Sequence, residues 1–522
     1  MSESSNSNPA GISPWIIAIA VMLSTFLEVL DTSVVNVSLP HIAGNLSATV
    51  NEATWVLTSY LVANAIVLPI TGWLANYFGR KRLLMTAVTG FTIASFLCGI
   101  APSLPLLVFF RILQGASGGC LQPISQAVLL ETFPPEQRGK AMAFWGMGIV
   151  VAPILGPTLG GWLTFNYSWR WVFYINLPIG IASLIMTQLY VFDPPYIGRK
   201  RGAGVDFWGL GLLAVGIGAL QILLDKGQED DWFGSHFIVW LAVIAAVGLA
   251  AFVIRELMAR HPIVHLRVFK NRTYATGVAL MSMLGFVLYG SLVLLPLFMQ
   301  ILLNYTSMAA GIWTSPRGLG SMIFMPITGI LLSRRWDARA LLTCGFLVAS
   351  VSLYMFSHFN LNSGTWGIFW PQFIQGAGMA FVFVPLTTVT MDPVPNEEMG
   401  NATSMFNLMR NIGGSIGISY ATTLVARRSQ FHQVRLAGHI NAFHNATRQA
   451  LAGAAAAMER HGISPPVAQH RALALLYGLL RQQATLLSYL DGFWLFALVF
   501  LVMTPLVWLM RRPRTGRAAA AH

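Results

Sequence analysis

Long apolar runs separated by short polar segments dominate this chain. A helix needs roughly 20 apolar residues to cross a bilayer, and each run approaches that length. The pattern predicts fourteen membrane-spanning helices, at residues 14–35, 54–74, 83–101, 105–130, 140–163, 171–192, 206–224, 236–255, 274–298, 309–332, 340–358, 366–390, 401–425 and 488–510. The first run has no basic region before it and no small-residue cleavage site, so we interpret it as a retained helix and not a signal peptide.

Composition supports an integral membrane protein. Of the 522 residues, 55% are hydrophobic and 10% are charged, whereas ordinary soluble domains carry about 25% charged residues. The net charge of +13 could indicate nucleic acid, but most basic residues stand in short runs between apolar segments, as the positive-inside rule describes. We therefore expect a lipid bilayer as partner and no nucleic acid. The three cysteines fall inside apolar segments, where no disulfide framework or zinc spacing is present.

The basic residues also predict orientation. They follow the even-numbered helices, at Arg80-Lys81-Arg82, Arg138 with Lys140, Arg199-Lys200-Arg201, Arg255 to Arg272, Arg334-Arg335 with Arg339, and the tail from Arg511. Both termini are then cytoplasmic. The segment 426–487 lies outside by this count although it holds several arginines, and long loops cross a membrane largely regardless of charge.

Three short motifs recur in order at nearly one offset. Gln114-Gly115-Ala116 returns as Gln375-Gly376-Ala377 and Pro134-x-Glu136 returns as Pro395-x-Glu397, both 261 residues later, and Pro69-Ile70-Thr71-Gly72 returns 257 residues later from Pro326. This repeat predicts two parallel six-helix halves around a midplane site, as in transporters. The expected divisions are a cytoplasmic N-terminal tail at 1–13, a six-helix bundle at 14–192, a linker with two extra helices at 193–273, a second bundle at 274–510 that includes the outer loop 426–487, and a cytoplasmic tail at 511–522.

Two carboxylates stand out because they lie three residues apart in the first apolar run, on one face of a helix. Ionised groups at membrane depth are rare and default to a functional interpretation. Asp31 and Glu28 are therefore candidate proton sites. The alternatives are that Asp31 only hydrogen-bonds a neighbouring helix and that Glu28 lies near enough to the surface to be hydrated.

Several motifs together resemble the major facilitator superfamily, and within it the fourteen-helix drug:proton antiporters of the EmrB-type multidrug efflux permeases. The resemblance runs from about Pro14 to Trp508 and is weakest across 426–487. It rests on Leu30-Asp31-Thr32 with Asn36 and Leu39-Pro40, Gly72 to Arg82, Arg111-Ile112-Leu113-Gln114-Gly115, Ala152 to Gly161, Trp169 to Pro178, and Asp225-Lys226-Gly227-Gln228 with Asp231-Trp232-Phe233.

The resemblance implies a proton-coupled mechanism. Arg111 lies several residues into the fourth helix, and a buried arginine needs a carboxylate partner. Asp31 is the natural partner because the first and fourth helices meet at the central cavity in the family. The repeat-related position holds Gln372, so we expect ionic chemistry to be confined to the N-terminal half.

Candidate gating residues lie in two glycine motifs. Gly72 and Gly79 bracket a tight turn before Arg80, and because the family usually has an acid where this chain has Asn76, we expect no strong charge latch there. In the fifth helix, small residues allow close helix approach and a proline can kink the helix. That helix is either a sliding hinge or a site of static packing, with candidates Gly156, Pro157, Gly160 and Gly161.

A drug cavity is mostly apolar and aromatic with a few polar anchors. The substrate-binding candidates, each of which could instead serve helix packing or face lipid, are Asn36, Gln122, Gln126, Trp145, Tyr289, Trp313, Gln375 and Asn407.

The outer segment 426–487 predicts a helical periplasmic hairpin. Asn445 to Arg460 has a helical composition, Pro465-Pro466 marks a break, and Val467 to Ser488 could continue into the last spanning helix. Its five histidines lack ligand spacing, so a solvated surface is favoured over metal binding. The resemblance implies that a membrane-fusion adaptor of the EmrA type binds this face and passes cargo to an outer-membrane channel.

The prediction is therefore an all-α polytopic transporter of the bacterial inner membrane that exports hydrophobic or amphipathic drugs in exchange for protons. It needs no cofactor beyond the proton gradient, and no Walker-type loop is present for ATP. One alternative is a proton-coupled exporter of a dedicated metabolite such as a fatty acid or siderophore. Another is a membrane enzyme or receptor, for which the sequence offers no nucleophile–base or metal constellation at membrane depth.

Overall fold

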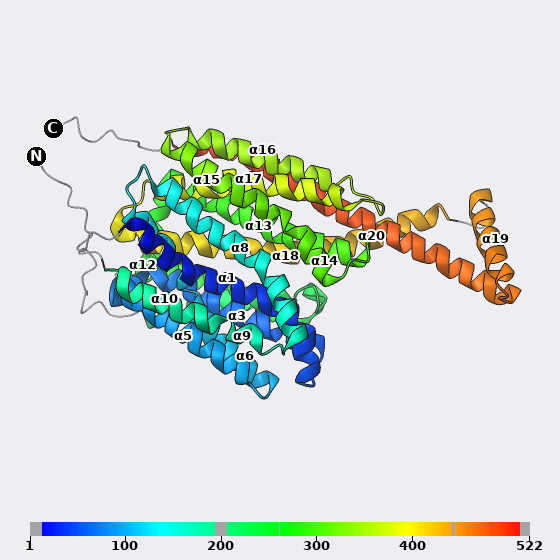
Figure 1. Ribbon diagram of the computed structural model, residues 1–522, viewed down its shortest axis with the longest axis horizontal. Helices are drawn as coiled ribbons and strands as arrows, with labels where there is room; N and C mark the ends of the chain where they lie inside the picture. The colour runs from blue at the N-terminus through cyan, green and yellow to red at the C-terminus, as the bar shows by residue number, and fades with distance from the viewer. Residues whose placement is uncertain (1–12, 194–205, 260–261, 441–443, 512–522) are drawn as a thin grey trace, which may run out of the picture.

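A computed structural model describes residues 13–193, 206–259, 262–440 and 444–511, and every regular element in these ranges is a helix (Figure 1). Three predicted segments lie outside the described residues: the N-terminal tail up to residue 12, the basic cluster Arg199-Lys200-Arg201, and the C-terminal tail after Arg511.

The first part of the chain forms eleven helical elements. They are α1 (Pro14–Asn45), α2 (Val50–Ala53), α3 (Trp55–Val67), η1 (Leu68–Ile70), α4 (Thr71–Phe78), α5 (Arg80–Ile100), α6 (Leu104–Gly118), α7 (Leu121–Thr132), α8 (Arg138–Asn166), α9 (Trp171–Tyr174) and α10 (Asn176–Tyr190).

The rest of the chain continues in the same way. Its elements are α11 (Phe207–Lys226), η2 (Trp232–Gly234), α12 (His236–Met258), η3 (Leu266–Lys270), α13 (Arg272–Ile301), α14 (Ser307–Thr314), α15 (Pro316–Ser333), α16 (Ala338–Phe356), α17 (Thr365–Met391), η4 (Asn396–Glu398), α18 (Met399–Gly438), α19 (Asn445–Arg460), α20 (Pro465–Leu506) and η5 (Val507–Leu509).

All fourteen predicted runs fall in helical segments, and within the described residues twelve of these segments are long and apolar enough to span a membrane. The other two are α15, which is preceded by the short helix α14, and α18. Helix α18 is less apolar because it carries buried polar side chains, among them Asn407 and Arg410. Their partners lie inside the protein, so hydropathy alone understates how deeply α18 is embedded. The fold is compatible with fourteen spans.

Two helical bundles lie side by side, and their helices run roughly along the long axis of the molecule (Figure 1). In the first, α1 packs against α7, α8 and α10, and α3 packs against α6; in the second, α13 packs against α18 and α15 packs against α17. The extra helices α11 and α12 pack on each other where α3 and α18 approach, and leucine, isoleucine and phenylalanine side chains fill the contact. The bundles meet along α8 and α15 and through α18 with α4 and α7.

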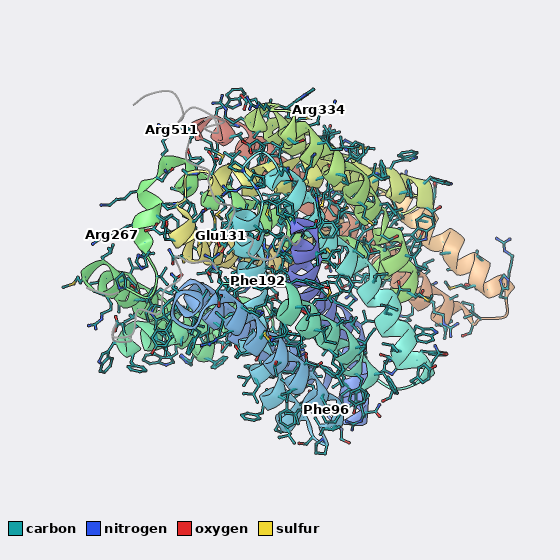
Figure 2. The ribbon with its side chains drawn as sticks, turned by 60° about the vertical axis from the view of Figure 1, so that its left-hand side comes forward. Phe96, Glu131, Phe192, Arg267, Arg334 and Arg511 are labelled. Carbon is teal, nitrogen blue, oxygen red and sulfur yellow. The ribbon has the colours of Figure 1, made fainter. Side chains whose placement is uncertain are left out.

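The two ends of the bundle differ in chemistry. Basic residues from three separate loops, Arg267, Arg334 and Arg511, lie around one end, which Figure 2 turns forward. Gly79, which joins α4 to α5, lies at this end, and we call it the Gly79 end. At the other end α18 and α20 continue beyond the bundle towards α19 (Figure 1). Helix α20 has 42 residues, about 63 Å at 1.5 Å per residue, which is roughly twice the 30 Å of a bilayer core.

Candidate functional site

The centre of the first bundle is a buried carboxylate held by three donors. Asp31 on α1 has no exposed surface, and its Oδ2 lies 2.6 Å from Arg111 Nη1 on α6. Its Oδ1 accepts hydrogen bonds from Gln114 Nε2 at 2.9 Å and from Asn176 Nδ2 at 2.7 Å. The structure therefore contains the Asp31–Arg111 pair that the sequence predicts.

Arg111 is held through its Nε and Nη1, whereas its buried Nη2 has no hydrogen-bond partner among the described residues. Its Nε donates to the carbonyl of Val56 at 3.0 Å, its Nη1 also donates to Gln114 Oε1 at 2.7 Å, and its guanidinium lies 4.2 Å from the ring centroid of Tyr60. Fully buried ion pairs are costly to form, and removal of one partner leaves an uncompensated charge. A proton that neutralised Asp31 would leave the charge of Arg111 uncompensated. The arrangement is therefore chemically suited to a conformational change that depends on protonation.

Glu28 lies one turn before Asp31 on α1. Its side chain is 6% exposed and one oxygen accepts from Asn64 Nδ2 on α3 at 2.9 Å. The other oxygen has no hydrogen-bond partner among the described residues, although the positive charge of Arg410 acts on the carboxylate. Glu28 is therefore buried, and the alternative of a hydrated surface acid is wrong.

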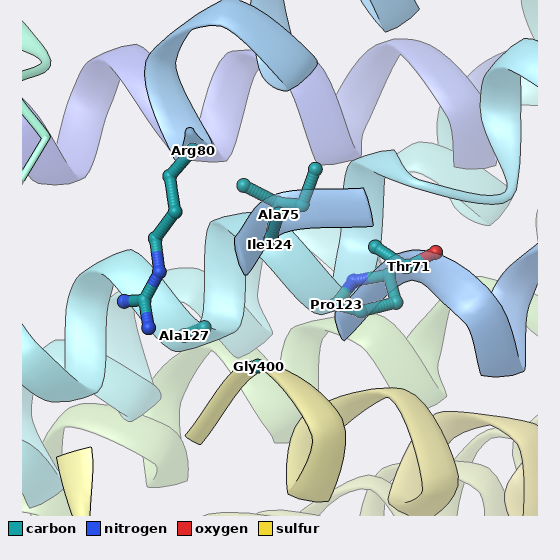
Figure 3. Close-up of a pocket in the computed structure, with 7 residues that line it drawn as sticks. All are labelled: Thr71, Ala75, Arg80, Pro123, Ile124, Ala127 and Gly400. Carbon is teal, nitrogen blue, oxygen red and sulfur yellow. The ribbon is translucent and has the colours of Figure 1, made fainter. Parts of the chain in front are cut away.

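At the Gly79 end the two bundles are in close contact. Gly72 lies so tightly against the backbone of Asn401 that no side chain would fit, and Thr403 Oγ1 donates to the carbonyl of Pro123 at 3.1 Å. A narrow pocket between α4, α7 and α18 is lined by Thr71, Ala75, Arg80, Pro123, Ile124, Ala127 and Gly400 (Figure 3).

Arg80 forms its ion pair inside its own bundle, so the expectation that this loop carries no strong charge latch between the bundles stays a prediction. It is 1% exposed, forms an ion pair with Glu131 on α7, and its Nη2 donates to the carbonyl of Asn396 in the second bundle at 3.5 Å. The acid that the loop lacks at Asn76 is supplied by a different helix, which loop composition could not reveal. Gly79 adopts a φ of +90°, a conformation that favours glycine, close to Asp193.

Four substrate-binding candidates make contacts that link the bundles. Asn407 Nδ2 donates to Gln126 Oε1 at 2.6 Å, and Arg410 donates to Gln122. Trp145 is fully buried, donates to Thr25 at 3.1 Å and stacks on Phe383 of the second bundle. With the two bundles in contact at the Gly79 end, these side chains bind other protein side chains.

The remaining four candidates do not come together. Asn36 is exposed, Tyr289 packs its ring on Gly414, Trp313 packs against the main apolar core, and Gln375 donates to Ser291 at 3.4 Å. Their role in binding stays a prediction.

The glycines of α8 are only partly as expected. Gly156 lies against Ser33 and Gly160 lies against Val34, both on α1, with no room for a larger side chain. Pro157 approaches Gly311 on α14. Gly161 has open space where a side chain would lie, so it takes no part in the close packing against α1, and its gating role stays a prediction.

Sequence reasoning assigned no role to several residues that complete the site. Asn176 and Gln114 lay within quoted motifs, but only the structure shows that both donate to Asp31. Arg317 on α15 donates to Gln372 Oε1 at 2.9 Å, so a cation also lies at the repeat-related position of the second bundle, although none of the ion pairs among the described residues includes it. The signal for Arg317 was a lone arginine in an apolar run.

Comparisons with known proteins agree with this architecture. A family model described as Major Facilitator Superfamily matches residues 21–418. The chain is 41% identical over 504 residues to the fatty acid resistance protein FarB of Neisseria gonorrhoeae, covering 96% of each chain. It is 40% identical over 511 residues to the multidrug export protein EmrB of Escherichia coli K12, covering 97% of this chain and 98% of that one.

Solved structures share the fold. The proton:xylose symporter XylE matches with a TM-score of 0.61 at 15% identity, over 96% of both chains. The human organic anion transporter MFSD10 matches with a TM-score of 0.61 at 13% identity, over 95% of this chain and 100% of that one. The chain has two helical bundles, a buried ion pair between two helices of the first, and relatives of this similarity over nearly its full length. This chain therefore belongs to the Major Facilitator Superfamily and is a transporter, not an enzyme.

Proposed function

We propose that this protein exports hydrophobic and amphipathic drugs across the bacterial inner membrane in exchange for protons. The observation that carries the proposal is the fully buried Asp31 carboxylate, which faces Arg111 and accepts from Gln114 and Asn176. The similarity to multidrug export proteins over nearly the whole chain supports the same conclusion.

Asp31 is the principal proton site and Arg111 is its switch partner. When Asp31 is ionised, the guanidinium is neutralised. A proton on Asp31 removes that neutralisation, so Arg111 must find new partners and the helices that hold it shift. Inward proton movement supplies the energy, because each charge that crosses 100 mV yields about 2.3 kcal/mol.

Glu28 is a second acid that links the proton site to the contact between the bundles. Gln122 and Arg410 both act on Glu28, and Arg410 donates to Gln122 across the bundle interface. A change of charge at Glu28 therefore alters the attraction between Glu28 on α1 and Arg410 on α18, beside the hydrogen bond from Arg410 to Gln122 on α7. This makes Glu28 the acid that senses whether the Gly79 end is closed.

The test is drug-dependent proton flux in liposomes that contain the purified chain. Asp31→Asn is expected to abolish the coupling of drug movement to proton movement, whereas Asp206→Asn is the matched control. Asp206 also pairs with an arginine, Arg255, but that arginine is 48% exposed and the pair lies at a helix end. Coupling in Asp31→Asn at the level of the unmodified chain would remove Asp31 from the mechanism.

The Gly79 end is cytoplasmic and the α18–α20 hairpin is periplasmic in this proposal, since basic loops stay inside. The hairpin binds a membrane-fusion adaptor of the EmrA type, which leads to an outer-membrane channel. The supporting features are its reach beyond a bilayer thickness and its charge, because residues 426–487 contain seven arginines and a single acid, Glu459. No cofactor takes part.

A second candidate is export of a dedicated metabolite with a fatty acid as cargo. The specific observation is the 41% identity to the fatty acid resistance protein FarB. A growth-inhibition panel of drugs and fatty acids in cells with and without the chain separates the two. Protection against fatty acids alone would favour the second candidate.

A further inference from the structure

The second bundle contains a polar cluster that repeats the Asp31 site without its acid. Gln114 donates to Asp31 in the first bundle, and 261 residues later Gln375 donates to Ser291 in the second. Ser291 thus stands where Asp31 stands, at an offset of 260. A hydroxyl has replaced the carboxylate.

The cation of the cluster has moved to the neighbouring helix. In the first bundle Arg111 lies over the ring of Tyr60. The repeat places Gln372 at the position of Arg111 and Arg317 at the position of Tyr60. In the second bundle Arg317 Nε donates to Gln372 Oε1 at 2.9 Å. The backbones agree with this pairing, since Gly115 packs on the carbonyl of Tyr60 and Gly376 packs on the carbonyl of Arg317. The same two positions touch in both bundles.

The result is a guanidinium that lacks a counter-charge. Among the described residues no carboxylate forms an ion pair with Arg317, and its buried Nη1 has no hydrogen-bond partner. Gln372, which is fully buried, also has an unpartnered Nε2. Arg80 and Arg111, by contrast, each face a buried carboxylate. Two neighbouring donors, Arg317 Nη1 and Gln372 Nε2, are therefore left without an acceptor among the described residues.

A carboxylate is the ligand that matches this set. Guanidinium and amide N–H groups form charge-assisted bonds to its two oxygens, and the ligand would supply the charge that Asp31 supplies in the first bundle. Gln375 Oε1, one turn along α17 from Gln372, is also unpartnered, but it is an acceptor and adds no donor to the set. The cluster is close to the contact between the bundles, because Gly318 packs on Ile154 of α8 and Arg317 itself keeps some exposed surface.

We propose that Arg317 and Gln372 form an anion-binding site that holds the carboxylate of an amphipathic cargo. The proposal rests on the export function proposed above and assigns to it one class of substrate. Cargo without a negative charge does not use this site. The free guanidinium is then a specificity-determining residue and is separate from the proton site at Asp31.

The experiment compares two probes with the same alkyl chain and opposite charge, dodecanoate and dodecyltrimethylammonium. Their binding to the purified full-length chain is measured by calorimetry in a non-ionic detergent, without a proton gradient. Arg317→Gln is expected to weaken dodecanoate binding by at least about tenfold, the usual scale for one charge-assisted contact, and to leave the cationic probe unchanged. Arg317→Lys is expected to retain part of the affinity.

Ser291→Asp is the second variant. It supplies an internal carboxylate at the position that Asp31 occupies in the first bundle, so it is expected to remove dodecanoate binding while the chain stays folded. Unchanged dodecanoate binding in Arg317→Gln, or equal loss of both probes, would overturn the proposal. Stabilisation by sodium chloride that depends on Arg317, with no dodecanoate binding, would identify a halide site and would also overturn it. Failure of proton coupling in liposomes leaves this binding result unaffected, so the two proposals fail separately.

Discussion

At the scale of single residues, the N-terminal bundle is built around one neutralised charge. Asp31 satisfies both carboxylate oxygens with donors from α6 and α10, and Arg111 is held by α3 and α6 as well. Such a pair contributes little net stability compared with apolar packing, but each partner makes the other tolerable in the interior. Removal of one of the two charges is therefore expected to destabilise the protein more than removal of both.

The pair makes a quantitative prediction for stability. Arg111→Met leaves Asp31 buried without its cation and should destabilise the protein by about 3–5 kcal/mol. Arg255→Met, which breaks the exposed pair with Asp206, should have little effect on stability. Denaturant unfolding in detergent measures both.

The double variant Asp31→Leu/Arg111→Met provides the control for this interpretation. It removes both charges and should recover most of the stability lost by Arg111→Met, while export stays abolished. If the double variant is no more stable than the single one, the loss comes from packing and not from an unpaired charge.

At the scale of elements, α1 and α8 approach closely because α8 presents glycines at one face. Gly156 and Gly160 are four residues apart, so both lie on the same side of the helix, and both contact α1 near the Asp31 turn. We therefore expect a displacement of α1 to move α8 as well, and α8 also contacts α15 of the other bundle.

Substitution of the glycines distinguishes this interface from the rest of α8. Gly156→Leu and Gly160→Leu should each lose export and lower thermal stability, because a side chain would overlap Ser33 or Val34. Gly161→Leu, next in the chain but with open space around it, should be tolerated. A drug-susceptibility assay and a thermal unfolding curve of each variant provide the measurement, and equal damage at Gly161 would contradict the packing explanation.

At the scale of the whole molecule, the two bundles are joined at the Gly79 end by side chains that come from both. Three hydrogen bonds form these links: Gln126 with Asn407, Gln122 with Arg410, and Arg80 with the carbonyl of Asn396. An alternating-access transporter has to break such contacts in each cycle.

A reversible cross-link tests this requirement. Cysteines at positions 126 and 407, joined by a short cleavable bifunctional thiol reagent, should arrest export, and cleavage of the reagent should restore it. Each single-cysteine variant treated in the same way reports any effect of the native cysteines. Export that continues in the cross-linked protein would show that the Gly79 end does not open.

The hairpin makes a separate prediction. Helices α18 and α20 support each other beyond the bundle through Arg428 with Asp491 at 2.5 Å and Gln433 with Tyr477 at 3.1 Å, so removal of α19 should leave them folded. A chain with residues 439–464 replaced by a short flexible linker should transport normally in liposomes and co-purify poorly with the adaptor. Full retention of the adaptor would place its binding site elsewhere.

The sequence by itself determined the helical architecture and its internal repeat, and together with the family resemblance it predicted the central ion pair. Apolar runs of spanning length, three recurring motifs and two intramembrane acids are local patterns, and the cost of burying a lone charge leaves Asp31 and Arg111 few partners besides each other. What only the tertiary structure decided are contacts between helices distant in the chain: Asn176 beside Asp31, Glu131 beside Arg80, and Arg317 beside Gln372. A side chain's partner across a helix interface depends on rotation and depth of both helices, and the spacing of residues along one chain does not specify either.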